Sequence, residues 1–538
     1  MAKINLDAVA AESREQRLGT VVYWNGDANT LAEQSGYSKS KKSCGGGKGG
    51  AGCRLCEAKG PFTQPSNCSE QMIEYQVGTV RDGVLIQHAP IGCSTSQTLV
   101  NSLYRTSLVD RGLKVENLRV FSTNLTEGDM VFGGIDKLRL TIEDVWEHYH
   151  PNAIFVGTSC PTGIIGDDID SVTEEYSEKL GIPVMPLHCE GFRSKHWSTG
   201  FDVTQHAILR QIVREPDPSR KQEDLVNIIR LWGADIFTPM LAPLNLRVNH
   251  VVDMSVVEDL AQMSEAAVTA TFCNTLGTYL AEGLEQRFGV PQVRAPQPYG
   301  ISGTDAWIRD IARITHREEL AEKYIASEHE RIAPGLEEMR KKLGGLQGFV
   351  ATGSAYAHGL ITVLRELGVV VNSSVVFHHD PIYDSEDPSQ DSLAYLVDNY
   401  GNIEDFLVSV RQPFQFYTLL KKHRPDFIII RHNGLASVAA AMGIPAAPLG
   451  DENIAIGYNG MENMGNLILD IIERRRFCED ISKHVSLRYT KWWSEQRDPH
   501  VLVKNPELIW EDDKSDSSAD GSNITAISDV PIADSKET

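Results

Sequence analysis

The feature that most constrains this chain is a repeated alternation of short apolar runs with longer amphipathic stretches. The runs are rich in β-branched residues and are bounded by turn residues, which is typical of buried strands. They predict strands at 83–87, 118–122, 153–158, 183–187, 246–252, 267–272, 348–352, 369–377 and 426–430. The stretches between them predict helices, for example at 169–179, 256–266, 318–343 and 435–442. Because strand and helix alternate, the pattern predicts βαβ units and parallel sheets.

Nine strands imply more than one sheet, and a chain of 538 residues is long enough for several domains. We therefore expect an α/β protein of three units built on parallel sheets. The expected divisions are an N-terminal arm with a Gly/Cys-rich segment (1–66), three α/β domains (67–215, 216–344 and 345–500) and an acidic tail predicted to be disordered (501–538). Regular structure is expected only after Pro65.

Composition restricts the classes of partner. The chain has 51 basic and 73 acidic side chains, a net charge of −22, and no basic stripe, so we expect no binding to nucleic acid. It shows neither a signal peptide nor an apolar run of the roughly 18 residues that cross a bilayer, which predicts a cytoplasmic protein without membrane contact. Nine cysteines, an odd number in a large chain, disfavour a disulfide framework and leave reduced thiols for metal binding.

Four cysteines follow predicted strands, namely Cys93, Cys160, Cys189 and Cys273. Ligands of open α/β sheets bind beyond the carboxyl ends of the strands, so these thiols are candidate ligands. For any one of them packing is the alternative, since a buried cysteine commonly acts as a small hydrophobic residue. Glycine and proline beside Cys93 and Cys160 favour a cluster that needs close backbone approach.

No phosphate-binding glycine loop followed by Lys and Ser or Thr is present, and no dinucleotide, nucleophile-elbow or zinc-protease motif is found. The lysine at Lys48 lies among glycines, but no strand precedes it and no Ser or Thr follows it. If the chain takes part in ATP-driven chemistry, another protein must hydrolyse the ATP.

Four motifs occur in order along the chain: His88-Ala-Pro-Ile-Gly-Cys93, the stretch 122–134, Thr158-Ser-Cys160-Pro-Thr-Gly with the following 164–169, and Cys189-Glu-Gly-Phe192. Together they resemble the component 1 superfamily of nitrogenases, and most of all its D (alpha) subunit. The resemblance extends over residues 67–466. It implies three doubly wound, Rossmann-like parallel-sheet α/β domains with iron–sulfur clusters between them, and pairing with a K-type (beta) subunit in a D2K2 heterotetramer.

The resemblance also implies which thiols bind metal. Cys68, Cys93 and Cys160 match the D subunit's ligands to a P-cluster, an iron–sulfur cluster shared with the K-type subunit. Cys273 matches the thiolate that anchors the large active-site iron–sulfur cluster. An ATP-dependent iron–sulfur reductase of the Fe-protein type is implied as the electron donor.

Four positions at the active-site cavity depart from the family pattern. Trp197 stands where nitrogenases carry a glutamine, and Phe201 where they carry a histidine that donates to a cluster sulfide. Gly450 stands at the position of the cluster's histidine ligand. Glycine or alanine near 434–436 replaces a lysine that holds homocitrate.

These departures, with the thiol-bearing segment 43–56 and the run 60–67, resemble a nitrogenase-like branch, the methylthio-alkane reductases. That branch cleaves a C–S bond of a small organosulfur substrate and releases methanethiol and a hydrocarbon. A scaffold for nitrogenase cofactor maturation is the alternative, because such scaffolds share the fold and lack the histidine ligand. A dinitrogen-reducing alpha subunit is a third reading, which Phe201 and Gly450 disfavour.

Candidate proton donors are Lys195 and His196, although Lys195 is equally compatible with an exposed loop charge. The first candidate for a replacement cluster ligand is His432, which follows a predicted strand. His378 and His379 come second and His358 third, with a hydrogen-bonded structural histidine as the alternative for each.

Three further thiols, Cys44, Cys53 and Cys56, lie in the glycine-rich N-terminal segment. They are candidates for zinc or for another iron–sulfur cluster, and the absence of any metal role is the alternative. Cys189 and Cys478 are expected to be packing residues. The heterometal, homocitrate, the chain length of the substrate and the role of the acidic tail are left open.

Overall fold

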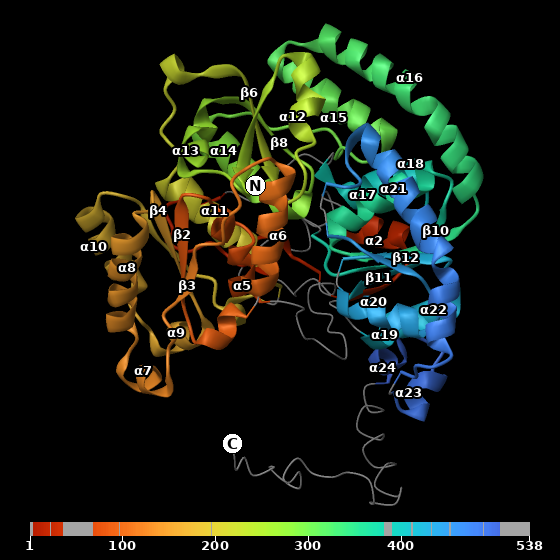
Figure 1. The fold of residues 1–538 in the computed structure, drawn as a ribbon, viewed down its shortest axis with the longest axis horizontal. Helices are drawn as coiled ribbons and strands as arrows, with labels where there is room; N and C mark the ends of the chain where they lie inside the picture. The colour runs from red at the N-terminus through yellow and green to blue at the C-terminus, as the bar shows by residue number, and fades with distance from the viewer. Residues whose placement is uncertain are drawn as a thin grey trace, which may run out of the picture.

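The computed structural model describes residues 4–21, 23–35, 68–95, 97–194, 196–380, 390–409, 413–431, 433–450, 453–487 and 489–505. Within these ranges the strands form three sheets. Figure 1 shows the first sheet at the left, the third at the right and the second between them, with the long helix α16 (Glu318–Leu343) curving over the right-hand side. The predicted α/β class with parallel sheets is confirmed.

The first sheet has the strand order β3-β2-β4-β5, and all its pairings are parallel. Its strands are β2 (Gly83–His88), β3 (Val120–Ser122), β4 (Ala153–Thr158) and β5 (Val184–Leu187). Alternate residues face opposite layers: Val84 and Ile86 pack in the core with α8 (Ile135–Tyr149) and α10 (Ile169–Leu180), whereas Leu85 belongs to the core that contains α5 (Ser69–Glu74) and α11 (Thr199–Gln211). Helices α6 (Gln97–Asp110), α7 (Glu127–Phe132) and α9 (Cys160–Ile165) complete this region.

The second sheet is parallel with the order β7-β6-β8 and consists of β6 (Gln222–Arg230), β7 (Arg247–Val252) and β8 (Ala266–Thr271). Its helices are α12 (Phe237–Leu241), α13 (Val257–Ala261), α14 (Asn274–Phe288) and α15 (Gly300–Thr315). Strand β6 was not predicted, because a buried polar residue interrupts its apolar run. That residue, Asn227, donates to the carbonyl of Met263 at 2.9 Å and to Oγ1 of Thr269 at 3.2 Å, so its burial is compensated.

The third sheet has the order β1-β11-β10-β9-β12-β13. Its strands are β1 (Tyr23–Gly26), β9 (Gln347–Thr352), β10 (Val370–Val376), β11 (Asp405–Ser409), β12 (Phe427–Ile430) and β13 (Ala446–Pro448). Around it lie α17 (Ser354–Glu366), α18 (Ser392–Tyr400), α19 (Pro413–His423), α20 (Asn433–Ala441), α21 (Gly457–Glu473), α22 (Arg475–Ser482), α23 (Lys491–Glu495) and α24 (Val501–Lys504). The short strands β1, β11 and β13 were not predicted.

The expectation that regular structure begins only after Pro65 is wrong. The N-terminal arm forms α1 (Arg14–Leu18), β1 and α2 (Ala28–Ser35), and β1 pairs antiparallel with β11 at the edge of the third sheet. The reason is that its short elements are stabilised by residues far along the chain, which local patterns do not report. The thiols Cys44, Cys53 and Cys56 and the acidic tail beyond residue 505 lie outside the described residues.

In each sheet the parallel strands are added first toward one edge and then toward the other. The place where this order reverses is called the switch point, and ligands of such sheets bind there. The switch lies between β2 and β4 in the first sheet, between β6 and β8 in the second, and between β9 and β12 in the third. Within the described ranges, no helix is both long and apolar enough to cross a bilayer.

Candidate metal centres

Three predicted ligands come together at the switch point of the first sheet. Cys93 lies in the 3-10 turn η2 (Ile91–Ser94) after β2, and Cys160 is the first residue of α9 after β4. Strands β2 and β4 are paired, with His88 opposite Thr158, so the two turns leave the sheet side by side. Cys68 precedes α5 as its N-cap residue. All three thiols are partly accessible.

A glycine lets two of these thiols approach each other. A Cβ at Gly191, in the Cys-Glu-Gly-Phe motif, would lie 3.1 Å from Cβ of Cys68 and 3.4 Å from Sγ of Cys160. The first distance is tighter than ordinary carbon contacts, so any larger side chain there would push the thiols apart. The motif therefore forms one wall of the thiol site.

The electrostatics of this site favour a cation. Burial raises the pKa of Cys68 to about 11 and that of Cys93 to about 12, and the neighbouring thiol of Cys160 and the carboxyl of Glu70 add to both shifts. Burial and Glu74 also raise the pKa of Glu70 to about 8. Several groups that are negative when ionised thus lie together without a counter-charge among them, and a bound metal cluster would compensate their charge.

The spacing of the candidate thiols bears on the kind of metal group that they could hold. Within the described ranges, no three His, Cys, Asp or Glu side chains converge closely enough to hold one metal ion. An iron–sulfur cluster presents separate irons to separate thiolates, so it needs neighbouring thiols that do not meet at one point. The Cys68, Cys93 and Cys160 set fits a polynuclear cluster.

The fourth predicted thiol, Cys273, lies at the switch point of the second sheet. It follows β8, caps the N-terminus of α14 and is only 9% exposed. Burial raises the pKa of its thiol, while backbone N–H groups of Leu276 and Thr275 and the guanidinium of Arg14 oppose that rise. A thiolate at a helix N-terminus beside an arginine is a favourable metal ligand.

Imidazoles from two other segments lie near Cys273. His378, in the turn after β10, places Nε2 3.2 Å from Oγ1 of Thr275, two residues beyond Cys273. The ring of His196 stacks obliquely on that of His378, with 4.2 Å between centroids. His358 is buried too, with Nδ1 2.9 Å from Oγ of Ser392.

The N-terminal arm reaches the same region through Arg14, a residue that sequence reasoning missed. Arg14 is 1% exposed; its Nε donates to Asp202 at 3.0 Å and its Nη2 to the carbonyl of Thr275 at 2.8 Å. It is also ion-paired with Asp380 at 3.5 Å. An arginine in a stretch with few apolar residues gave no signal, because its partners lie hundreds of residues away.

The departures from the family pattern have definite surroundings. Phe201 is buried and meets Trp197 edge-on at 5.6 Å, and Trp197 meets His378 edge-on at 5.7 Å. A Cβ at Gly450 would meet nothing within 4 Å, and the Gly450 carbonyl accepts from Nε1 of Trp232 at 3.1 Å. The positions that the resemblance marks as departures are therefore occupied by two packed aromatic rings and by a glycine with open space beside it.

Some predicted residues cannot be placed. Lys195 and His432 lie outside the described residues, so their roles stay predictions. Cys189 is buried with Sγ 3.2 Å from the Thr158 carbonyl, as expected of a packing residue. Cys478 is partly buried in α22.

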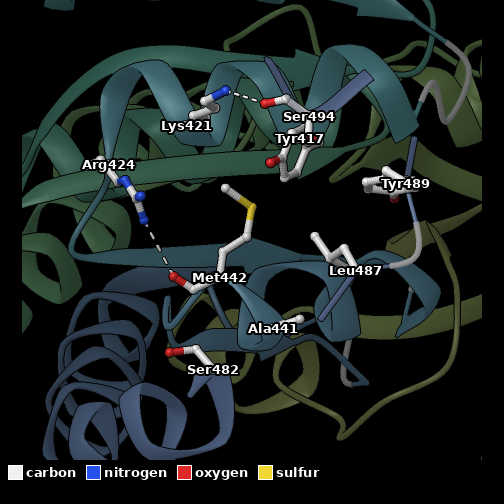
Figure 2. Close-up of a pocket in the computed structure, with 9 residues that line it drawn as sticks. All are labelled: Tyr417, Lys421, Arg424, Ala441, Met442, Ser482, Leu487, Tyr489 and Ser494. Atoms are coloured by element: carbon white, nitrogen blue, oxygen red, sulfur yellow. Dashed lines mark hydrogen bonds between the residues drawn. The ribbon is translucent and has the colours of Figure 1, made fainter. Parts of the chain in front are cut away.

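A separate hollow carries none of the predicted residues. Figure 2 shows a pocket of about 450 Å³ in the third-sheet region, where Tyr417, Met442 and Leu487 form apolar walls. Its two cations are engaged with main-chain carbonyls, Lys421 with that of Ser494 and Arg424 with that of Met442 at 3.4 Å. The candidate metal ligands lie elsewhere, at the switch points of the first and second sheets.

Comparison with known proteins identifies the family. Residues 74–473 match the family described as nitrogenase component 1 type oxidoreductase. The chain belongs to this family. The nitrogenase molybdenum-iron protein alpha chain of Methanothermobacter thermautotrophicus is 28% identical over 431 residues, which are 77% of this chain and 86% of that protein.

Other nitrogenase component 1 relatives include a cofactor biosynthesis protein. The nitrogenase iron-molybdenum cofactor biosynthesis protein NifE of Methanococcus maripaludis is 26% identical over 415 residues, 72% of this chain and 79% of that protein. Among solved structures, nitrogenase Cp1 at pH 6.5 superposes with a TM-score of 0.65 at 21% identity, covering 80% of this chain and 92% of that one. The structural likeness confirms the fold.

Proposed function

We propose that this chain is the catalytic subunit of a nitrogenase-like reductase that cleaves the C–S bond of methylthio-alkanes. The observation that carries the proposal is the neighbourhood of Cys273, a buried thiol at a helix N-terminus beside Arg14, near which the ring of Trp197 meets those of Phe201 and His378 edge-on. An apolar wall suits a thioether, which offers a soft sulfur and alkyl groups and few hydrogen-bonding sites.

The reaction requires two electrons and two protons, which convert R–S–CH3 into R–H and CH3SH. A nitrogenase-type iron–sulfur cluster, when bound, supplies low-potential electrons and iron that can bind a thioether sulfur. Cys68, Cys93 and Cys160 would hold a P-cluster-type group shared with a K-type subunit, and Cys273 would hold the active-site cluster. An ATP-dependent Fe-protein-like reductase would supply the electrons in a D2K2 assembly.

Proton delivery is assigned to the chain's own residues. Burial lowers the pKa of His196 well below its usual value, and the nearby His378 lowers it further. A neutral imidazole can still pass a proton by donating its N–H and being reprotonated from the other side. Lys195, the neighbour of His196 in the sequence, is the proposed source of the proton that reprotonates His196.

The test uses the purified complex of this chain with its K-type subunit. With reductase, ATP and a methylthio-alkane we expect methanethiol and the matching hydrocarbon in equal amounts, and no ammonia from dinitrogen. The matched control is a Cys273→Ala complex, which should assemble and release no methanethiol. Ammonia in place of methanethiol would contradict the proposal.

The alternative function is a scaffold for nitrogenase cofactor maturation, which the similarity to NifE favours. A scaffold transfers its cluster, whereas an enzyme retains it. Incubating the iron-loaded complex with a cluster-free component 1 protein separates the two. Iron that moves to the acceptor, together with no product from either substrate, would support the scaffold.

A further inference from the structure

Two buried imidazoles near Cys273 each present one nitrogen that has no hydrogen-bond partner in the described part of the chain. The atoms are Nε2 of His196 and Nδ1 of His378. Both side chains are at most 1% exposed, and their rings lie 4.2 Å apart between centroids. Buried polar atoms are normally paired, so two orphaned nitrogens side by side point to a missing ligand.

The surroundings of His378 determine which of its nitrogens carries the proton. Its Nε2 lies 3.2 Å from Oγ1 of Thr275 and 3.5 Å from Oδ2 of Asp380. Asp380 is a carboxylate, because Arg14 pairs with it and the Thr20 hydroxyl donates to it. Nε2 therefore holds the proton and donates, which leaves the lone pair on Nδ1. A carboxylate that orients an imidazole in this way is the usual neighbour of a metal-bound histidine.

His196 has the opposite tautomer. The backbone N–H of Ser198 donates to its Nδ1 at 3.2 Å, so Nδ1 is the acceptor and the proton lies on Nε2. The Ser198 hydroxyl lies 2.6 Å from the same nitrogen. The orphaned atom of His196 is thus a donor, and that of His378 is an acceptor.

The N-terminal arm holds this pair in position. Val21 forms an isolated antiparallel bridge with His379, the residue after His378. The Val21 N–H donates to the His379 carbonyl at 2.7 Å, and the Val21 carbonyl accepts from the His379 N–H at 3.0 Å. The backbone that carries His378 is therefore fixed from both its own sheet and the arm.

We propose that Nδ1 of His378 is the imidazole ligand of the cluster anchored by Cys273, and that Nε2–H of His196 donates a hydrogen bond to one of that cluster's sulfides. This inference rests on the proposed function, because it requires a cluster at Cys273. A lone pair for iron and an N–H for sulfide are the two kinds of group that an iron–sulfur surface takes from imidazoles. Together they replace the histidines lost at Phe201 and Gly450.

The experiment examines the whole complex with its K-type subunit, purified without oxygen from cells grown with natural or ¹⁵N-labelled histidine. In pulsed electron paramagnetic resonance we expect the reduced cluster to show an imidazole-nitrogen modulation that changes on labelling. The modulation should disappear in His378→Ala, and the iron content should fall to that of Cys273→Ala. His206→Gln is the matched control, since both nitrogens of that buried histidine already have partners, Tyr279 at 2.8 Å and the Ala8 carbonyl at 2.9 Å.

The proposed hydrogen bond from His196 is tested by a separate measurement, the reduction potential of the cluster. His196→Leu should keep the nitrogen modulation and the iron but shift the reduction potential of the cluster downward, because hydrogen bonds to sulfur raise that potential. An unchanged potential would overturn the role of His196. If His378→Ala fails to assemble, His378→Cys is used, and it should retain iron while losing the modulation.

The outcomes separate this inference from the function on which it rests. Cys273→Ala with the iron content and spectrum of the unaltered complex would overturn both, because no cluster would then sit at Cys273. Iron lost in Cys273→Ala, with the modulation unchanged in His378→Ala or His378→Cys, would overturn the role of His378 alone.

Discussion

At the scale of single residues, the thiol site depends on the absence of a side chain. Gly191 lies against Cys68 and Cys160, where a methyl group would come within 3.1 Å of the first and 3.4 Å of the second. Two nearby glycines allow a matched comparison, because a Cβ at Gly92, next to Cys93, would meet nothing within 4 Å. A side chain larger than hydrogen is therefore excluded by its neighbours at Gly191 and has free space at Gly92.

We expect Gly191→Ala to displace the thiols and to lower the affinity of this site for iron by tenfold or more. Altering groups that support a metal site commonly lowers its affinity by about 10–100-fold. Gly92→Ala should bind iron as the unaltered chain does. Iron and acid-labile sulfide per complex are the measurements, with circular dichroism to confirm folding. Equal iron in both variants would contradict the role of Gly191.

The positions of the candidate cysteine ligands were largely predictable, whereas the tautomers of the buried histidines were not. Cys93, Cys160 and Cys273 follow apolar runs, so their position at strand ends could be read locally. The proton positions on His196 and His378 depend on Ser198 and Asp380, contacts that exist only after folding. Arg14 was missed for the same reason.

At the scale of elements, the close packing of two helices sets the position of Cys68. Gly200 in α11 faces the start of α5, where a Cβ would lie 2.2 Å from the Ser69 carbonyl oxygen and 2.7 Å from Cβ of Met72. The backbone atom cannot move aside without moving α5, and Cys68 is the N-cap of α5. The contact between α11 and α5 thus fixes the position of one candidate metal ligand.

Gly200→Ala should therefore destabilise the fold by about 1–3 kcal/mol, the usual cost of overpacking, and reduce iron at the thiol site. Gly128→Ala is the control, because Gly128 is an exposed glycine of α7 where a Cβ would have Oγ1 of Thr126 as its nearest neighbour, 3.8 Å away. The denaturant midpoint measures the first effect. A Gly200→Ala protein as stable as Gly128→Ala would be inconsistent with tight helix packing.

The arm is the second element that bears on a site. Arg14 pairs with Asp202 and Asp380, whose side chains are 0% and 4% exposed. Removing the arginine leaves the buried Asp380 without its guanidinium and the buried Asp202 with Arg17 alone, so Arg14→Ala should cost about 3–5 kcal/mol of unfolding free energy. Chemical denaturation measures the loss.

The control for the arm is an exposed pair of the same chemistry. Arg309 contacts Glu322 at 2.6 Å, with side chains 47% and 56% exposed, and Arg309→Ala should change stability by less than about 1 kcal/mol. If Arg14→Ala and Arg309→Ala lose the same unfolding free energy, burial is not the reason that the Arg14 network stabilises the fold.

At the scale of the whole molecule, buried neutral histidines make stability depend on pH. Burial lowers the pKa of His206 and His379 to about 4 each, and it also lowers the pKa of His88 and His358. The unfolded chain takes up these protons near pH 6.5, whereas the folded chain resists them. The stability is thus complete above pH 6.5 and is lost as the pH falls toward 4.

We expect the denaturant midpoint of the complex to fall steadily between pH 7 and pH 5, with up to about 1.4 kcal/mol per pH unit from each such histidine. Burial raises the pKa of Glu70 to about 8 and that of Asp391 to about 6, so these carboxyls act in the opposite sense. The histidines outnumber them. His206→Gln should flatten the slope, and a midpoint independent of pH would contradict this account.

Much of the architecture was predictable because parallel sheets are built from runs that are apolar throughout. All nine predicted strands are present, and the helix at 318–343 matches α16. The missed strands are of two kinds: β6, which carries a buried asparagine, and β1, β11 and β13, which are short and lie toward sheet edges. Local patterns are weakest there, because pairing partners supply the stability.

The pairing of β1 with β11 also bears on the order in which parts of the chain fold. Tyr23 lies opposite Ser409, so a strand synthesised at the start of the chain waits for a partner made near its end. Bringing such distant segments together is entropically costly and comes late in folding. Because Arg14 and Val21 belong to the same arm, the region around Cys273 is expected to stay open during synthesis and to close last, which leaves an interval in which a preassembled inorganic cargo can be loaded.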